Sequence, residues 1–273
     1  MYSIYQEALG MKKGLFITFE GGEGSGKTTA IQSVKERLEQ HGHEVVVTRE
    51  PGGVLLAEEI RELILYQEMD AMTEVLLFAS ARMEHLKEVV IPALHEGKIV
   101  LCDRFVHSSY VYQGIVKGVG LDTVKQINEL VIGDYYPDAT VHLDLDARMG
   151  LYRIQANNRE TNKMDEYDLS FHESVREGYR SVFEKEDKSE VFWIDASKHI
   201  EDVGVMASIQ VLSFVESKAE AENYPLFLIE YEYPQLRAIY HAVGKFHTEE
   251  EANKRFLEGN PDMSIRTISR VEQ

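Results

Sequence analysis

One run of eight residues constrains this chain more than any other feature. Residues 21–28 read Gly-Gly-Glu-Gly-Ser-Gly-Lys-Thr and match the phosphate-binding pattern G-x-x-x-x-G-K-[ST] at every position. The apolar, β-prone segment 15–19 precedes this phosphate loop, and a helical pattern over 29–40 follows it. Backbone N–H groups of such a turn surround phosphate oxygens, and the helix N-terminus adds partial positive charge. The sequence therefore predicts that the chain binds a nucleotide.

The residues of the phosphate loop differ in what they contribute. Lys27 adds a full positive charge beside the phosphates, and the hydroxyl of Thr28 is suited to bind Mg²⁺. The alternative is a glycine-rich turn without a ligand, which the flanking strand and helix argue against. The residues that we expect to contact the nucleotide are Gly21, Gly22, Glu23, Gly24, Ser25, Gly26, Lys27, Thr28 and Thr29.

Strand and helix patterns alternate from residue 15 to residue 215. Strands are predicted at 15–19, 44–48, 99–103, 140–145 and 191–195. Helices are predicted at 29–40, 56–65, 72–90 (ending near Pro92), 108–114, 122–131, from 147, from 168 to 185, and at 200–215. Such alternation is typical of an α/β fold with a parallel sheet covered by helices on both faces. Ligands then bind at the carboxyl ends of the strands.

Composition narrows the range of partners. The 273 residues are 44% hydrophobic and carry a formal net charge of -18. A charge of that sign argues against a nucleic-acid or anionic-membrane surface, since such surfaces need clustered Lys and Arg. A membrane span is not expected, because the chain contains no run of about eighteen apolar residues. Cys102 is the only cysteine, so an internal disulfide is impossible and a reducing cytoplasm is the expected location.

Both ends of the chain differ from the region between them. Residues 1–13 are predicted to be an N-terminal extension. The run Met11-Lys12-Lys13-Gly14 leads into the first strand and would itself make a natural start, so residues 1–10 are expected to be dispensable. Residues 216–273 are predicted to be a small α+β appendage that follows a linker at 219–223. Its expected elements are strands at 227–233, 238–246 and 265–271 and a helix opened by the capping box of Thr248 and Glu251. Docking, oligomerisation and simple packing all remain open as its role.

Four further segments belong with the phosphate loop, and one of them, 108–114, offers hydroxyls and an amide suited to read a base or sugar. Proline and glycine in the segment 48–53 fix the backbone that carries Arg49. Phe78 and Arg82 are four residues apart, so they share one helix face and suit a base, although a core Phe and a solvated Arg would give the same spacing. Asp103 ends an apolar strand, the usual place for the Mg²⁺-side acid of a phosphate loop.

Together these segments resemble bacterial thymidylate kinases over nearly all of residues 14–215. The matching motifs are Phe-Glu-Gly-x-Glu-Gly-Ser-Gly-Lys-Thr-Thr, Thr-Arg-Glu-Pro-Gly-Gly, Asp-Arg-[aromatic] and Ser-Ser-x-x-Tyr-Gln-Gly, in that order. The resemblance implies a P-loop kinase fold with a five-stranded parallel sheet and usually a homodimer. It also implies transfer of the γ-phosphoryl group of ATP to dTMP, with Mg²⁺.

The resemblance also gives individual residues a role. For the nucleotide base it implies stacking on Phe78 and hydrogen bonds from Arg82 and Gln113, with Ser109 and Tyr112 beside the base and sugar. Glu23 matches the acid that accepts the sugar 3′-hydroxyl, and Tyr112 would crowd the 2′ position. The cations that match the acceptor-phosphate site are Arg49, Arg61 and Arg104. Catalysis would fall to Lys27, Asp103, Arg153, Arg159 and Lys163, and Mg²⁺ to Thr28 and Asp103.

The stretch 157–168 matches the lid of the family. Members without a cation at the variable positions of the phosphate loop usually supply one from the lid, and this chain has Glu23 and Ser25 at those positions. Charge on the transferring phosphoryl group must be neutralised, so Arg153, Arg159 and Lys163 are the candidates, against the alternative of a solvated charged loop. Two residues depart from the common pattern: His107 stands where many members have Asp, and Lys163 where Arg is frequent. We expect His107 to be solvated or hydrogen-bonded rather than catalytic.

Two other functions remain to be separated from dTMP phosphorylation. One is a kinase for dUMP or a 5-modified pyrimidine deoxynucleotide, because a single methyl group in an apolar pocket contributes only about 1–3 kcal/mol. The other is a nucleotide-binding interaction protein that uses residues 216–273 as its partner surface. The presence of Asp103 and of the base-side residues favours an enzyme.

Overall fold

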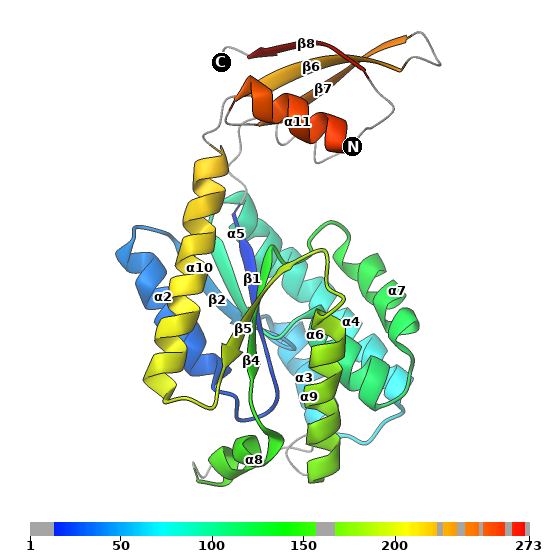
Figure 1. The fold of residues 1–273 in the computed structure, drawn as a ribbon. Coiled ribbons are helices and arrows are strands. Elements are labelled where there is room, and N and C mark those ends of the chain that lie inside the picture. The colour runs from blue at the N-terminus through cyan, green and yellow to red at the C-terminus, as the bar shows by residue number, and fades with distance from the viewer. Residues whose placement is uncertain are drawn as a thin grey trace. The chain divides into compact units, whose positions relative to one another are not determined.

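The computed structural model describes residues 14–156, 167–222, 226–233, 238–245, 248–259 and 264–270. These fall into two compact units that divide between Leu212 and Ser213. The first unit contains, in chain order, β1 (Phe16–Glu20), α2 (Lys27–Gln40), β2 (Val45–Arg49), α3 (Leu55–Tyr66), α4 (Ala71–His85), η1 (Leu86–Val90), α5 (Ile91–His95), β3 (Ile99–Asp103), α6 (Val106–Ser109), η2 (Tyr110–Val116), α7 (Leu121–Ile132), β4 (Ala139–Asp144), α8 (Ala147–Ala156), α9 (Leu169–Phe183), β5 (Glu190–Asp195) and the start of α10 (Ile200–Glu222) (Figure 1).

The predicted α/β fold with five parallel strands is confirmed. The strand order is β2-β3-β1-β4-β5, and every neighbouring pair is parallel. β1 lies in the middle, with β3 on one side and β4 on the other. The chain leaves β1 at the point where the strand order reverses, which is where open α/β sheets bind their ligands. The phosphate loop begins at that point.

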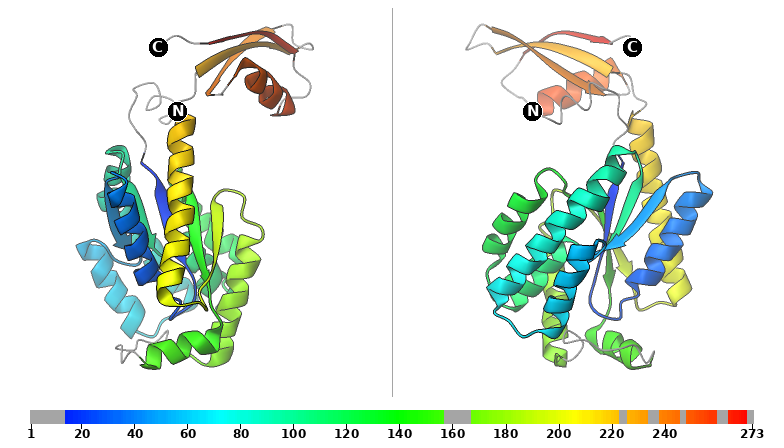
Figure 2. Two further views of the ribbon diagram at one scale, coloured as in Figure 1. Left: turned by 60° about the vertical axis from the view of Figure 1, so that its left-hand side comes forward. Right: turned by 180° about the vertical axis from the view of Figure 1, so that it is seen from behind.

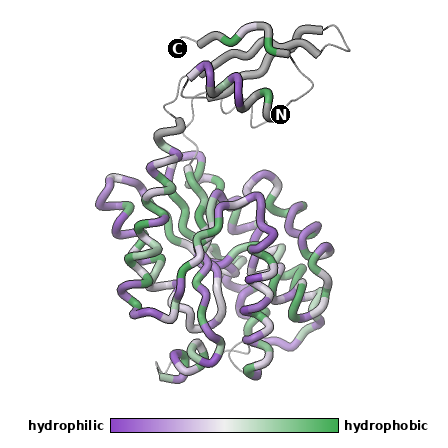
Figure 3. Tube along the Cα trace, viewed as in Figure 1, coloured by the Kyte–Doolittle hydropathy of each residue, from purple (hydrophilic) through white to green (hydrophobic). Residues whose placement is uncertain are grey.

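Alternation along the strands divides the core between two layers of helices. Phe16, Val100 and Cys102 face one cluster, to which α4, η2, α7 and α9 contribute buried side chains. The intervening residues of the strands face the other side, where α2 and α10 lie together (Figures 1 and 2). Hydrophobic residues follow the central strands, and hydrophilic residues predominate on the outer faces of the helices (Figure 3). Both faces of the sheet are therefore covered, as its continuous apolar strands require.

The predicted helix over 72–90 is longer and less regular than expected. α4 passes into the π-helical turn η1, and helical backbone then continues through α5 to His95. Pro92 does not end it, because Pro92 stands in the first turn of α5, directly after the wide π-helical turn η1. The segment after Ser109 is likewise π-helical, over Tyr110–Val116. Such wide turns are frequent at functional sites, and η2 carries two residues that line the cleft, Tyr112 and Gln113.

The second unit is an antiparallel sheet with one helix. β6 (Leu226–Tyr233) is central between β7 (Ala238–Lys245) and β8 (Ser264–Arg270), and α11 spans Glu249–Gly259. The predicted linker at 219–223 is wrong up to residue 222, because α10 continues to Glu222. Ala and Glu, which make up residues 219–222, are strong helix formers. Within the described residues, no helix is long and apolar enough to span a membrane.

Candidate active site

The phosphate loop connects β1 to α2 and encloses the Lys27 side chain. The Nζ of Lys27 donates to the carbonyl oxygens of Gly21 (3.1 Å) and Gly22 (3.2 Å). Burial lowers the pKa of Lys27, and the nearby charge of Arg104 lowers it further. An anion at this position would favour the charged form of Lys27, so the loop is arranged for a negatively charged ligand.

Gly24 shows why glycine is needed in this loop. Its φ of 72° lies in the left-handed region, and a Cβ there would sit 2.3 Å from the carbonyl oxygen of Gly150 in α8. No side chain fits against backbone at that distance. The backbone of the loop therefore packs directly on α8, the helix that carries Arg153.

A single cleft of about 700 Å³ joins the phosphate loop to the predicted base-binding residues. Of the predicted site residues it is lined by Glu23, Gly24, Ser25, Gly26, Lys27, Thr28, Thr29, Arg49, Arg61, Phe78, Arg82, Asp103, Arg104, Ser109, Tyr112, Gln113 and Arg153. Gly21 and Gly22 stand behind it and hold Lys27. Arg159 and Lys163 lie outside the described residues. The fold thus brings residues from seven segments of the chain into one cavity.

Arg104 and Glu23 meet in the middle of the cleft. The Nη2 of Arg104 donates to Oε1 of Glu23 (2.6 Å), and its Nη1 donates to Ser108 Oγ (3.1 Å). The Tyr112 hydroxyl also donates to Glu23 Oε1 (3.3 Å), and the Arg104 guanidinium lies 5.3 Å from the Tyr112 ring centroid. Arg104 is the only described non-glycine residue with positive φ, 70°. This strained backbone directs its guanidinium across the cleft towards the phosphate loop.

Glu20, the last residue of β1, holds the segment that carries Arg104. Its fully buried carboxylate accepts from the backbone N–H of Phe105 (2.8 Å), from Ser108 Oγ (2.6 Å) and from the Tyr179 hydroxyl (2.9 Å). These bonds join the ends of β1 and β3 and the start of α6. The sequence analysis did not single out Glu20, although it immediately precedes the phosphate loop.

Two more cations stand near Arg104. Arg49 makes two bonds of 2.9 Å to the carboxylate of Glu58, and Arg61 donates to the carbonyl oxygen of Pro51 (2.9 Å). The pKa of Arg61 is lowered by burial and then by the neighbouring charge of Arg49. Three arginines at one wall of the cleft therefore favour a doubly charged anion between them.

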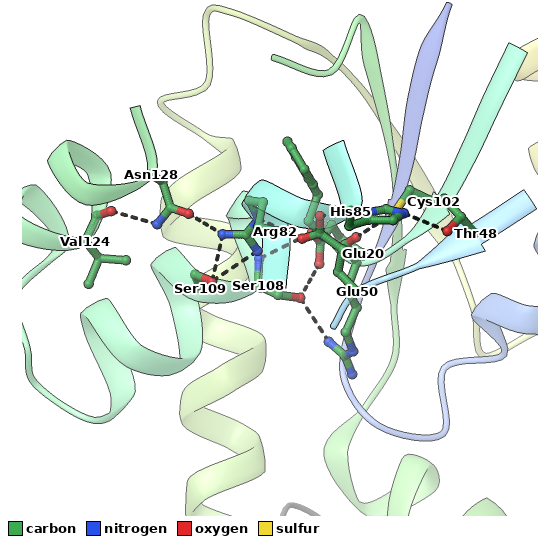
Figure 4. Close-up of polar contacts among 12 residues, drawn as sticks. Glu20, Thr48, Glu50, Arg82, His85, Cys102, Ser108, Ser109, Val124 and Asn128 are labelled. Carbon is green, nitrogen blue, oxygen red and sulfur yellow. Dashed lines mark hydrogen bonds and ion pairs between the residues drawn. The ribbon is translucent and has the colours of Figure 1, made fainter. Parts of the chain in front are cut away.

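At the other end of the cleft Arg82 is buried and fixed. Its Nε donates to Oε2 of Glu50 (2.6 Å), and its Nη1 donates to Asn128 Oδ1 and to Ser109 Oγ (Figure 4). The Arg82 side chain is only 2% exposed. The predicted alternative of a solvated arginine is therefore wrong, because α4 packs this face against η2 and α7.

His85 holds the second oxygen of the Glu50 carboxylate. Its Nδ1 donates to Oε1 of Glu50 (2.9 Å), and its Nε2 pairs with the Thr48 hydroxyl (2.7 Å; Figure 4). An ionised carboxylate only accepts hydrogen bonds, which assigns the proton of this bond to Nδ1. Glu50 is therefore held from both sides, and Arg82 with it.

A second buried carboxylate stands behind Gln113. The Nε2 of Gln113 donates to Oε1 of Glu74 (2.6 Å), and Lys117 Nζ bonds both oxygens of the same carboxylate (2.9 and 2.8 Å). Glu74 belongs to α4, whereas Gln113 belongs to η2 and Lys117 follows it directly. Phe78, one turn after Glu74, lines the cleft beside them.

Glu50, Glu74 and His85 are site-supporting residues that the sequence analysis missed. One signal was available, because Glu74, Phe78 and Arg82 recur at intervals of four on one face of α4. Glu50 stands inside the Thr-Arg-Glu-Pro-Gly-Gly motif next to Arg49. The pairing of these acids with partners more than thirty residues away has no local signal.

Asp103 ends β3 with one oxygen unsatisfied. Its Oδ1 is buried and has no hydrogen-bond partner within the described residues, and both Asp103 and Thr28 line the cleft. The described part of the chain contains no group of three or more His, Cys, Asp or Glu suited to a metal ion. One carboxylate with a hydroxyl fits Mg²⁺ that brings phosphate oxygens and water as its other ligands.

His107 is buried and hydrogen-bonded. Its Nε2 lies 2.9 Å from Glu186 Oε2 and 2.9 Å from the Tyr136 hydroxyl. Burial, the largest single influence, would raise the pKa of Glu186, but the hydrogen bond and charge of His107 together with the hydrogen bonds from Tyr136 and the Lys188 backbone lower that pKa to about 2. His107 is absent from the cleft lining, as expected of a structural histidine.

Comparisons with known proteins agree with this geometry. The family model described as "Thymidylate kinase" matches residues 19–206. A protein named thymidylate kinase from Geobacillus sp. (strain WCH70) is 48% identical over 210 residues, which cover 76% of this chain and 100% of the relative. One from Staphylococcus haemolyticus (strain JCSC1435) is 50% identical over 189 residues, 69% of this chain and 92% of the relative. The crystal structure of thymidylate kinase from Ehrlichia chaffeensis superposes with a TM-score of 0.60 at 35% identity, covering 73% of this chain and 99% of that one.

Proposed function

Because this chain belongs to the thymidylate kinase family, we propose that it transfers the γ-phosphoryl group of ATP to dTMP and so forms dTDP. The observation that carries this proposal is the continuous cleft between the phosphate loop and the buried pair Arg82 and Gln113. One end suits phosphates and the other suits the polar edge of a base. A cavity of about 700 Å³ is in the range of small-molecule sites.

ATP supplies the phosphates at the loop end. Backbone N–H groups of residues 24–29 and the N-terminus of α2 stabilise their charge, and Lys27 lies beside them. We assign Mg²⁺ to Thr28 and Asp103. The support is the buried, unpartnered Oδ1 of Asp103. Mg²⁺ bound there would neutralise charge that develops on the phosphoryl group.

dTMP occupies the rest of the cleft. Its phosphate lies against the cations Arg49, Arg61 and Arg104, and its sugar 3′-hydroxyl points to Glu23. Tyr112, whose hydroxyl is bonded to Glu23, leaves little room for a 2′-hydroxyl. The base stacks on Phe78 and meets Arg82, Gln113 and Ser109 at its polar edge.

The transfer is a direct, in-line displacement without a covalent enzyme intermediate. An oxygen of the dTMP phosphate forms a bond to the γ-phosphorus as the bond to the β–γ bridging oxygen breaks, and ADP leaves. The protein contributes position and charge, because the transition state offers little covalent chemistry to a side chain. Arg153 on α8 lines the cleft and is the described candidate for neutralising this charge, with Arg159 and Lys163 as further candidates.

A coupled assay with ATP and Mg²⁺ tests the assignment. We would offer dTMP, dUMP, dCMP and dGMP separately and measure kcat/KM for each. The proposal requires dTMP to have the highest value. A higher value for dUMP would make the chain a kinase for another pyrimidine nucleotide, and no turnover with any acceptor would favour a nucleotide-binding interaction protein.

We propose that the chain works as a homodimer in a reducing cytoplasm. Large apolar side chains are exposed on neighbouring helices, namely Leu56, Leu63 and Tyr66 on α3 and Leu76 and Met83 on α4. Exposed apolar residues gathered in this way favour contact with a second copy. Sedimentation of the wild type and of Leu63→Asp tests this: the variant should sediment as a monomer, and an unchanged state would exclude this face.

We further propose that residues 14–215 form the catalytic unit and that residues 216–273 are appended to it, after the N-terminal extension 1–13. Support comes from the cleft lining, which extends from Glu23 to Ile200 and includes none of the residues of the appendage that the structure describes. A chain ending at Glu222 should keep kcat/KM within about twofold. A loss of about tenfold would assign the appendage a part in catalysis.

A further inference from the structure

The orientation of the Gln113 amide at the base end is set by charged groups outside the cleft. Gln113 lines the cleft, whereas Glu74 and Lys117, which stand behind it, do not. The side chains of Glu74 and Lys117 are 2% and 14% exposed, and Gln113 is 1% exposed. Three polar side chains are thus fixed where little water reaches them. A donor or acceptor left without a partner there costs free energy.

An amide beside a carboxylate has one favourable orientation. Lys117 Nζ donates to both oxygens of the Glu74 carboxylate, so both oxygens act as hydrogen-bond acceptors. Gln113 must therefore turn its NH₂ group to Glu74, as it does at 2.6 Å. A flipped amide would set its carbonyl oxygen against the carboxylate. Within the described residues no group donates to the side-chain carbonyl oxygen (Oε1) of Gln113, so this acceptor is available to a ligand.

Arg82 supplies a hydrogen-bond donor beside the acceptor of Gln113. Its guanidinium only donates, and Glu50 holds its Nε at 2.6 Å. The base end thus presents one donor and one acceptor, each fixed by a buried carboxylate. Thymine and uracil offer the matching pair, the O4 acceptor and the N3–H donor. Cytosine offers an amino donor and an unprotonated N3, which mismatch both.

We propose that Glu74 is a positioning residue for base selection: its carboxylate turns the Gln113 carbonyl to the base and so selects bases with an N3–H donor over cytosine. This inference rests on the proposed function, in which Gln113 meets the polar edge of the base. Glu74 acts through Gln113 and touches no substrate. The plain alternative is an ion pair that only ties α4 to η2.

The variant Glu74→Gln distinguishes a positioning role of Glu74 from a purely structural ion pair. The new amide keeps its carbonyl on Lys117 and turns its NH₂ group to Gln113, whose amide then flips and presents NH₂ to the base. We expect the kcat/KM ratio of dTMP to dCMP to fall about tenfold to a hundredfold, while the KM for ATP stays unchanged. The ratio of dTMP to dUMP should not move, because these bases share O4 and N3–H. Glu129→Gln, the same change at an exposed carboxylate, should leave every ratio unchanged.

Two further variants keep the test decisive. Combining Glu74→Met with Lys117→Met replaces the ion pair by apolar side chains, a change that buried pairs often tolerate, and frees the Gln113 amide. It should also lower the ratio of dTMP to dCMP. In a Gln113→Leu background, Glu74→Gln should have no further effect on this ratio.

Equal losses for dTMP, dUMP and dCMP in the Glu74 variants would overturn the inference and leave a structural ion pair. An unchanged ratio of dTMP to dCMP would do the same. Failure of the wild type to phosphorylate dTMP would instead remove the proposed function itself, so the two failures are distinct.

Discussion

The two ends of the cleft, which we propose bind phosphate and base, are built in different ways. At the phosphate end consecutive residues do the work, largely through backbone groups and glycines such as Gly24, and one side chain, Lys27, is held by loop carbonyls. At the base end Arg82 and Gln113 come from separate elements, and buried carboxylates hold both. Phosphate groups are the same in every nucleotide, so a loop that binds any nucleotide phosphate suffices. A base must be told from others, and that requires fixed donors and acceptors.

The largest effect should come from the charge at the phosphate end. Lys27→Ala removes the cation beside the transferred phosphoryl group, and we expect kcat to fall by about 10²–10³ or more. The fold should persist, since the loop carbonyls that Lys27 contacts can bind water. Steady-state kinetics and circular dichroism check this. Turnover at the wild-type rate would contradict the assignment of the loop.

A smaller and more selective loss should follow at the base end. Arg82→Ala should lower kcat/KM for dTMP by about 10²-fold, because a charged hydrogen bond to the base is lost. The KM for ATP should change less than twofold. Glu50 also loses the cation that it pairs with, so the free energy of unfolding should fall by about 3 kcal/mol, which a lower melting temperature reports. Equal weakening of dTMP and ATP would show that Arg82 does not face the base.

Phosphate binding by the loop should be sensitive to a single added methyl group. Gly24→Ala sets a Cβ against the carbonyl of Gly150, so we expect the KM for ATP to rise about tenfold and base preference to stay unchanged. Gly42→Ala is the matched control, because Gly42 also has positive φ (84°) but nothing within 4 Å. If both variants bound ATP equally well, backbone contact at the loop would not matter for the phosphates.

The smallest effect should come from the indirect support of Arg82. His85→Ala leaves one oxygen of Glu50 unsatisfied and frees Arg82, so the KM for dTMP should rise about threefold to tenfold with little change in kcat. His85→Gln can still donate to Glu50 and should restore part of the affinity. A fall in kcat with an unchanged KM for dTMP would mean that His85 supports the fold rather than Arg82.

Sequence reasoning reached the parallel sheet, because the apolar strands and the patterns around them are local signals. The strand predicted at 99–103 has the same bounds in the structure, and the other strands of the first unit lie within one residue of their predicted bounds. The helical stretch through Pro92 departs from its prediction, because a π-helical turn has no distinct periodicity and proline fits a first helical turn.

From the sequence, only those site residues could be predicted that stand in recognisable motifs or at helical spacing. Arg82 was recognisable by its spacing from Phe78, but its burial was not, since Asn128, which pairs with it, is 46 residues away. His85, Glu50 and Glu74 are supports, whose effect depends on what tertiary packing places beside them. Spacing along the chain cannot show such pairs.

Glu23 belongs to the phosphate loop by its backbone, and its carboxylate holds Arg104 on the side that we propose for dTMP. Any displacement of the loop by bound ATP would therefore also displace Arg104 and the hydroxyl of Tyr112. The affinities of the two substrates are then thermodynamically linked: whatever factor ATP applies to dTMP binding, dTMP must apply to ATP binding. Calorimetry with a non-hydrolysable ATP analogue measures this factor from both directions, and Glu23→Gln should bring it towards one.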